Sequence, residues 1–401
     1  MTDATAHHPR PYDIVLFGAT GFTGALTAEY LAEHADPGTR WALAGRNRKK
    51  LEAVRDRLAE IDPACAELPL LHADTTDTAS IEEMARSTRV VITTVGPYAE
   101  YGEPLVAACA RSGTDYVDLT GEPQFADRMY VKYHAEAVRS GARIIHACGF
   151  DSIPHDLGVY YTVKQLPEDV PLHVEGFVRV NATFSGGTLH SAVGVFSDAS
   201  GVLRAERERR ALVERPAGRR VRISRRPVPK AKVGDGWTLP MPTIDPAIVT
   251  RSAAALDRYG PDFTYGHYVA VKRFPVAAAM AAGSGAVLAL AQLPPTRALL
   301  LRIATPGEGP SPERRARHWF SVKFVGEGGG ERVVTEVRGG DPGYDETAKM
   351  LAESALCLAH DDLPETSGQV TTAAAMGDAL LARLVRAGLT FRVIEQGPTK
   401  R

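Results

Sequence analysis

The stretch Asp13-Ile-Val-Leu-Phe-Gly18-Ala-Thr-Gly21-Phe-Thr-Gly24 decides the fold of this 401-residue chain. Its apolar first half predicts a buried strand, and a helix is expected over Phe22–Ala35. A tight strand-to-helix turn needs residues without Cβ, so that a diphosphate can approach backbone N–H groups and the helix can pack closely on the sheet. The turn therefore predicts a dinucleotide site. Its expected contacts are Gly18, Thr20, Gly21, Phe22, Thr23 and Gly24.

The segments around this turn alternate short β-rich runs with helical patterns, which is typical of βαβ units. Strands are expected at Tyr12–Phe17, Trp41–Ala44, Pro69–His72, Val90–Val95, Tyr116–Leu119 and Arg143–Ala147. Alone, three spaced glycines could be a chance loop, but this setting favours a cofactor turn. We predict an α/β fold in which residues 12–156 form a Rossmann-type doubly wound parallel sheet. Residues 1–11 have no apolar run and are expected to be a disordered tail without a signal peptide.

The end of the second strand indicates which nicotinamide cofactor fits. An NAD-preferring enzyme carries an acid here for the ribose 2′-OH, but this chain has Arg46 and Asn47. A guanidinium suits a 2′-phosphate, so NADP is expected, although Arg46 and Arg48 could simply solvate a helix start. Asp74, after the third strand, is either an adenine contact or a helix N-cap.

The turn after the fourth strand carries Gly96 and Pro97. Because ligands of such sheets bind beyond the carboxyl ends of the strands, this turn is expected to pass along the nicotinamide ribose.

Residues 157–401 show a different pattern of predicted elements, with longer strand-like runs and fewer, more widely spaced helices. Strands are expected at Leu172–Thr183, His267–Arg273, Ala316–Val325 and Glu331–Val337. Their alternation predicts an α+β substrate domain with a largely antiparallel sheet. Residues 204–232, rich in Arg and Lys and broken by Pro and Gly, are expected to be a solvated, partly mobile excursion.

Composition limits the class of protein. The formal net charge is −1, so no overall basic field for nucleic acid exists. Four separated cysteines without a C-x-x-C pair favour a reducing cytoplasm and give no zinc or disulfide framework. The uncharged stretch Phe274–Leu293 is expected to be a buried helix, with a membrane-contacting helix as the alternative.

Several blocks resemble the saccharopine dehydrogenase-like oxidoreductases, and within them the bacterial trans-acting enoyl reductases. The blocks are Gly18–Gly24, Ala44–Asn47, Val95–Tyr98, Asp118–Glu122, Gly149–Gly158, Ser185–Thr188 and Gly368–Gly377. The resemblance implies NADPH-dependent reduction of an enoyl intermediate in polyketide-derived lipid or glycolipid assembly. It also implies a partner synthase that acts in trans.

Enoyl reduction needs a hydride delivered to the β-carbon, a hydrogen-bond donor that polarises the thioester carbonyl, and an acid that protonates the α-carbon. The reaction needs no metal. Tyr98, His155 and Asp151 are the catalytic candidates, because they lie on loops after the later strands. Asp151 and Ser152 could instead cap the helix that starts near Pro154. The expected substrate contacts are Glu122, Ser152, Ser185, Gly186, Gly187 and Thr188.

Other functions remain open at this stage. One is a saccharopine-type dehydrogenase acting on an imine or amino-acid adduct, for which no convincing set of basic residues is present. Another is a non-catalytic NADP-binding scaffold at a lipid surface. The segment 204–232 could also dock an acidic acyl carrier protein or an anionic lipid surface.

Overall fold

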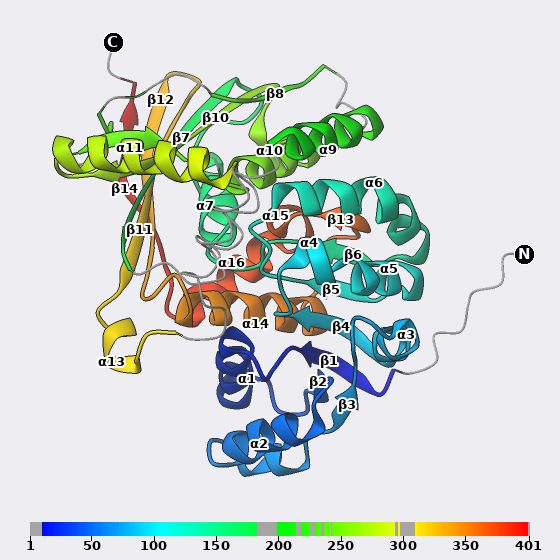
Figure 1. Ribbon diagram of the computed structural model, residues 1–401. Helices are drawn as coiled ribbons and strands as arrows, with labels where there is room; N and C mark the ends of the chain where they lie inside the picture. The colour runs from blue at the N-terminus through cyan, green and yellow to red at the C-terminus, as the bar shows by residue number, and fades with distance from the viewer. Residues whose placement is uncertain are drawn as a thin grey trace, which may run out of the picture.

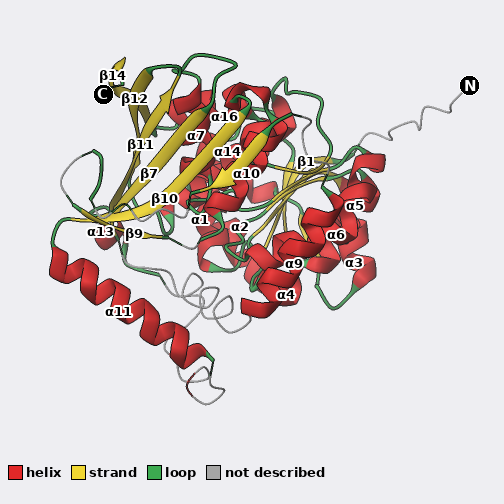
Figure 2. Cartoon of the chain, turned by 90° about the horizontal axis from the view of Figure 1, so that it is seen from above, coloured by secondary structure: helices red, strands yellow, loops and turns green. Residues whose placement is uncertain are grey.

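The computed structural model describes residues 10–182, 199–213, 218–224, 228, 230–233, 236–241, 243–292, 296 and 309–399. Two seven-stranded sheets organise this part of the chain (Figure 1). Helices lie between the sheets and on the far side of the first one (Figure 2).

The first sheet is parallel throughout, with strand order β13-β6-β5-β4-β1-β2-β3. Its strands are β1 Tyr12–Phe17, β2 Trp41–Gly45, β3 Leu70–His72, β4 Thr88–Thr93, β5 Asp115–Val117, β6 Arg143–Ile145 and β13 Gly368–Val370. Each strand expected before residue 156 forms, with its ends shifted by at most two residues. The Rossmann-type prediction is confirmed.

The crossovers of this sheet are mostly helical, as parallel pairing requires. They are α1 Phe22–His34, α2 Arg48–Ala59, the 3-10 helix Pro63–Glu67, α3 Thr78–Ser87, α4 Tyr98–Tyr101, α5 Glu103–Ser112 and α6 Pro123–Ser140. Helix α7 Ile153–Val163 follows β6 and leads into the second sheet. Ile14–Leu16 on β1 and Val90–Ile92 on β4 are fully buried on both faces of the sheet, which explains their continuous apolar sequence.

The second sheet has the order β14-β12-β11-β7-β10-β8, with β9 also paired to β10. Its strands are β7 Leu172–Asn181, β8 Arg220–Ile223, β9 Trp237–Pro240, β10 Asp262–Val271, β11 Trp319–Gly328, β12 Glu331–Gly339 and β14 Thr390–Pro398. Pairing is antiparallel except where β10 meets β7 and β8. The sheet is therefore mixed.

The remaining described helices follow β7 in the chain. They are α9 Ala199–Leu212, α10 Asp245–Ala255, the 3-10 helix Asp257–Tyr259, α11 Phe274–Ala291, α13 Pro312–Arg315, α14 Asp345–His360, α15 Thr372–Ala375 and α16 Gly377–Arg386. Helices α7, α14 and α16 lie between the sheets (Figure 2). One apolar core runs from Ile14 on β1 through Leu351 on α14 to Phe324 on β11.

Three sequence-based expectations differ from the structure. The first sheet takes its edge strand β13 from the C-terminal part of the chain, although residues 157–401 had been assigned to the second domain. The described parts of the basic segment 204–232 are not a free excursion, because α9 packs on α6 and β8 pairs with β10. Among the described arginines of this segment, Arg219 donates to the carbonyls of Ala253 and Leu256 at 2.8 Å each, and Arg209 pairs with Asp127 at 2.6 Å.

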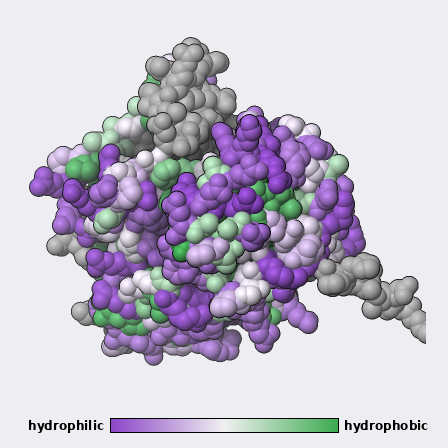
Figure 3. Space-filling view, turned by 90° about the horizontal axis from the view of Figure 1, so that it is seen from below, coloured by the Kyte–Doolittle hydropathy of each residue, from purple (hydrophilic) through white to green (hydrophobic). Residues whose placement is uncertain are grey.

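The third difference concerns the uncharged segment, which forms helix α11 but is not buried. Phe274 is 56% exposed, and Val276 and Met280 are also exposed. By contrast, the face of the molecule around α2 is mainly hydrophilic, with apolar side chains only in small separate groups (Figure 3). Among the described residues, no helix combines the length and the apolar character that crossing a membrane requires.

Candidate active site

The glycine turn lies between β1 and α1. Gly18 has φ = +101°, a conformation that favours glycine. A Cβ on Gly24 would lie 2.1 Å from the Gly18 carbonyl oxygen, so only glycine allows α1 to approach the turn this closely. No side chain caps α1 and no acid lies in its first turn, which leaves its first amides open to an anion.

The loop after β4 meets this turn at the carboxyl edge of the sheet. The Thr94 amide donates to the Phe17 carbonyl at 3.0 Å, and the Thr94 hydroxyl donates to the Gly18 carbonyl at 3.1 Å. The loop that carries Gly96 and Pro97 therefore starts directly beside the glycine turn, where the sequence predicted it.

Phe22 has a structural role besides its place in the turn. Its ring packs edge-on against Tyr344, with centroids 4.9 Å apart, and the Arg315 guanidinium lies over it. The first helix is thus anchored to the C-terminal half of the chain next to the expected cofactor site.

The residues after β2 have different roles. Asn47 is the N-cap of α2, since its side chain accepts a hydrogen bond from the Lys50 amide at 3.1 Å. Arg46 is exposed and forms no ion pair with another described residue. Arg48, in contrast, pairs with Glu52 at 3.1 Å.

Asp74 does not cap a helix, so that alternative is wrong. Asp77 is the N-cap of α3, and the Asp74 carboxylate instead accepts hydrogen bonds from the amide and hydroxyl of Thr76 at 3.0 and 2.9 Å. These two hydrogen bonds lower the pKa of Asp74, and the nearby charge of Arg46 adds to the effect. Asp74 and Arg46 thus lie close together beyond β2 and β3.

Tyr98 and Glu122 support the loops rather than face a ligand. The buried Tyr98 hydroxyl donates to the Thr93 carbonyl and accepts from the Leu119 amide, both at 3.1 Å. Burial raises the pKa of Tyr98 well above its ordinary value. The Glu122 carboxylate accepts from the amides of Tyr98 and Ala99 at the start of α4, at 3.1 and 2.9 Å. The prediction that Tyr98 donates a proton in catalysis is therefore wrong, because its hydroxyl is held by backbone groups.

The block Asp151-Ser152-Ile153-Pro154-His155 lies where β6 gives way to α7. Ser152 is the N-cap of α7, with φ = 138°, but its hydroxyl makes no capping bond. That hydroxyl is buried and has no hydrogen-bond partner among the described residues, and the same holds for Nε2 of His155. A buried polar atom without a protein partner is available to a bound water or a ligand.

Asp151 is partly exposed and lies beside Gly121, in the loop after β5. Burial raises the pKa of Asp151 to about 6, the negative charge of Asp245 adds to the rise, and His155 opposes it. Asp151 can therefore hold a proton near neutral pH at the carboxyl edge of the first sheet.

Sequence reasoning missed the second half of this cluster. His155 Nδ1 lies 2.9 Å from Asp245 Oδ1, and His267 Nε2 lies 3.5 Å from Asp245 Oδ2. Tyr265 shares a 2.9 Å hydrogen bond with Nδ1 of His267. Tyr265 and His267 are two residues apart on β10, so their side chains point to the same face of the sheet, and both are buried. This pair of polar residues on one strand face was the sequence signal for the second half of the cluster.

The charges in this cluster are set by burial and by the two histidines. Burial alone would raise the pKa of Asp245, but His155, His267 and a hydrogen bond from Thr243 bring it well below its ordinary value. Burial lowers the pKa of His267 to about 3, so this ring is neutral. Asp245 is thus an ionised carboxylate that holds His155 in place.

Asp156 holds the surrounding helices together. Its carboxylate accepts from the hydroxyls of Ser252 and Thr372 at 2.5 and 2.7 Å, and from the Ala373 amide at 2.9 Å. These contacts fix α7 against α10 and α15. The expected substrate contacts Ser185, Gly186, Gly187 and Thr188 lie outside the described residues.

Comparison with known proteins identifies the family. Residues 14–145 match the saccharopine dehydrogenase NADP binding domain. The chain is 39% identical over 413 residues to a trans-acting enoyl reductase of Mycobacterium ulcerans (strain Agy99), covering 95% of this chain and 97% of that protein. The chain belongs to the saccharopine dehydrogenase-like oxidoreductases. A trans-acting enoyl reductase of Mycobacterium bovis (strain BCG / Pasteur 1173P2) is 38% identical to it, over 95% of this chain and 97% of that protein.

This saccharopine dehydrogenase-like oxidoreductase also shares a fold with a solved structure. Apo saccharopine dehydrogenase (L-Glu forming) from Saccharomyces cerevisiae superposes with a TM-score of 0.54, over 96% of this chain and 100% of that one. The two are 11% identical, so the likeness concerns the fold alone.

The oxidoreductase uses NADP(H), and its residues fit that cofactor. The open amides at the start of α1 can hold the diphosphate. Arg46 is free to bind a 2′-phosphate, because no described carboxylate pairs with it. The nicotinamide end would then lie toward Gly96, Gly121 and Asp151.

Proposed function

We propose that this oxidoreductase reduces the double bond of an enoyl thioester with NADPH, in the assembly of a polyketide-derived lipid or glycolipid. The names of its relatives support the reaction class. The observation that carries the proposal is the partly exposed carboxyl of Asp151, with its pKa raised to about 6, near Ser152 Oγ and His155 Nε2, two buried atoms without partners among the described residues.

In this mechanism, bound NADPH supplies the hydride for the β-carbon of the substrate. The charge that develops on the thioester oxygen needs a hydrogen-bond donor in a site without bulk water. The Ser152 hydroxyl is a suitable donor, since it is buried and makes no other hydrogen bond to the described residues.

The α-carbon then needs a proton. Asp151 supplies it, because a carboxyl group with a pKa of about 6 is partly protonated near neutral pH. His155 lies four residues further along the chain, with its Nδ1 2.9 Å from Asp245 Oδ1, and its charge acts on Asp151. His155 and Asp245 would thus act through Asp151.

The test is NADPH oxidation with a panel of enoyl thioesters and cyclic imines. We expect turnover of enoyl thioesters only. Asp151→Asn should lower kcat by roughly a hundredfold to ten-thousandfold and remove the fall in kcat above pH 6. Asp362→Asn removes an exposed carboxylate and should leave the rate unchanged. Turnover of imines alone, or an Asp151→Asn rate equal to that of the wild type, would contradict the proposal.

A carrier-bound substrate would need a docking surface, and α9 is our proposed site for an acyl carrier protein. Arg204 and Arg207 are exposed on this helix, whereas Arg209 is already paired with Asp127 at 2.6 Å. Arg204→Gln with Arg207→Gln should raise KM for a carrier-bound thioester and spare a small thioester. Equal KM changes for both substrates would exclude docking at α9.

Contact with a lipid surface is a separate proposal, supported by α11. Its exposed apolar residues include Phe274, Val276 and Met280, and Lys272 and Arg273 precede them. The full chain should float with anionic vesicles, and Phe274→Ser with Met280→Ser should reduce the bound fraction. An unchanged fraction for the double variant would exclude α11 as the contact.

A further inference from the structure

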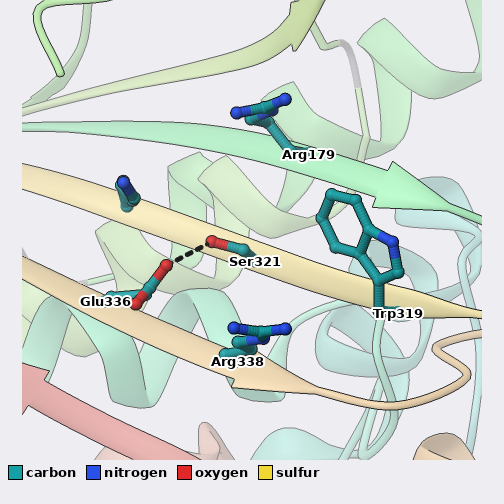
Figure 4. A pocket seen from close by; sticks show the side chains of 6 residues that line it. Arg179, Trp319, Ser321, Glu336 and Arg338 are labelled. Carbon is teal, nitrogen blue, oxygen red and sulfur yellow. Dashed lines mark hydrogen bonds between the residues drawn. The ribbon is translucent and has the colours of Figure 1, made fainter. Parts of the chain in front are cut away.

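The outer face of the second sheet carries a shallow pocket away from the cluster around His155. Along β11, Phe320, Val322 and Phe324 point inward and are fully buried. Trp319, Ser321 and Lys323 alternate with them and therefore point outward. The pocket is lined by Arg179, Trp319, Ser321, Lys323, Glu336 and Arg338 (Figure 4).

The register of three strands explains why these side chains meet. Ser321 on β11 is directly opposite Arg179 on β7 and also opposite Arg338 on β12. The short serine side chain forms the floor, and the two guanidinium groups lie on either side of it (Figure 4). Trp319 and Lys323 lie two residues before and after Ser321 on the same face.

The one carboxylate of the lining is already compensated. Glu336 accepts from the Ser321 hydroxyl at 2.8 Å and from Arg392 Nε at 2.9 Å, so each of its oxygens has a donor. Arg179, Lys323 and Arg338 form no ion pair with another described residue. Three positive charges therefore surround the floor, and among the described carboxylates only Glu336, which already accepts from Ser321 and Arg392, feels the charge of one of them, Lys323.

The spacing suits a tetrahedral anion better than a carboxylate. Arg179 and Arg338 lie on strands that flank β11, so their backbones are about 10 Å apart. With one guanidinium on each side, the space between them fits one phosphate. Its oxygens can accept hydrogen bonds from both arginines and from Lys323 at the same time. A planar carboxylate is satisfied by one arginine. The half-buried indole of Trp319 beside them offers a surface for a flat ring.

We propose that this outer pocket binds a nucleoside phosphate, with its phosphate between Arg179 and Arg338 and its base against Trp319. The site is separate from the NADP turn at Gly18, and it does not depend on the reaction proposed above. The ligand is defined by two features together, a phosphate group and an attached aromatic ring.

The experiment is calorimetric titration of the full chain saturated with NADP⁺, so that the cofactor site is filled. The probes are ADP, adenosine and inorganic phosphate. ADP should bind at one additional site per chain, at least tenfold more tightly than either of the other probes. No additional ADP site under these conditions would overturn the proposal.

Variants assign the additional site to the pocket. Arg179→Gln with Arg338→Gln should weaken ADP binding at least tenfold, while NADPH affinity stays unchanged. Trp319→Leu should remove the preference of ADP over inorganic phosphate. Arg139→Gln, which removes an exposed charge on α6, is the matched control and should have no effect.

A second change guards against misfolding of the double variant. Lys323→Glu reverses one charge at the rim of the pocket and should also weaken ADP binding at least tenfold. Retained ADP affinity in both the double variant and Lys323→Glu would overturn the assignment to this face.

Discussion

Asp151 illustrates how the fold changes the chemistry of a single residue. In an unfolded chain its carboxyl group has a pKa near 4, and burial in the folded chain raises that pKa to about 6. The raised pKa makes the residue a useful acid, but it also means that the folded state carries an unfavourable buried charge at neutral pH.

Asp151→Asn should therefore stabilise the protein in a pH-dependent way. Below about pH 4 the carboxyl is protonated in both the folded and unfolded states, so the substitution gains nothing. Between pH 4 and 6 the unfolded chain loses its proton first, and above pH 6 the penalty reaches on the order of 1–3 kcal/mol. Thermal unfolding at pH 4 and pH 7.5 measures this, and an equal change in Tm at both pH values would contradict it.

Arg46 determines the choice of cofactor in our account. Arg46→Ala should reduce kcat/KM for NADPH by roughly tenfold to a hundredfold, because a charge-assisted pair with the 2′-phosphate is lost. The value for NADH should not change. Arg48→Ala is the control, since Arg48 pairs with Glu52. Equal losses for the two cofactors would show that Arg46 does not recognise the phosphate.

At the level of single residues, the sequence was more reliable for glycines than for polar side chains. Gly18 and Gly24 could be predicted because a backbone conformation and a close contact require them. Tyr98 and Glu122 were misjudged because a polar residue after a strand can serve a ligand or the backbone equally well. Asp245 and His267 come from distant segments, and only the tertiary fold brings them to His155.

Among the elements, the β1 turn and α1 were predictable because their pattern is local. The exposure of helix α11 was not predictable. An uncharged run of that length predicts a helix, but the sequence does not show whether other elements cover that helix. Segment 204–232 was misjudged because its charges suggested solvent, whereas ion pairs and carbonyl contacts hold α9 and β8 in place.

The close approach of α1 to the glycine turn can be tested directly. Gly24→Ala places a methyl group 2.1 Å from a backbone oxygen, so the turn must shift. We expect at least a tenfold loss of NADPH affinity and a lower Tm. Gly283→Ala adds the same methyl group to exposed α11, where no atom lies within 4 Å, and should stabilise the helix by up to about 1 kcal/mol. Unchanged NADPH affinity in Gly24→Ala would contradict the proposed cofactor turn.

On the scale of the whole molecule, the two sheets depend on each other. β13 completes the first sheet beside β6, and α14 covers β1, β4 and β5. Both elements come from the last sixty or so residues, so local sequence patterns could not assign them to the first sheet. A shared core of this kind makes the two halves one folding unit.

A fragment of residues 10–163 should therefore fail to fold. It would expose the edge of β6 and the apolar face that α14 covers in the full chain. Circular dichroism and NADPH titration would show a loosely folded or aggregated fragment without NADPH binding, next to the full chain as control. A cooperative unfolding transition with normal NADPH affinity would show that the first sheet is independent.

The decisive experiment is isotope transfer to an enoyl thioester from NADPH that carries deuterium at both hydrogens of the nicotinamide C4. We predict one deuterium at the β-carbon of the saturated product, and in D₂O with unlabelled NADPH one deuterium at the α-carbon. A product labelled at the carbonyl carbon, or an unlabelled enoyl thioester recovered while a cyclic imine is reduced, would contradict this prediction.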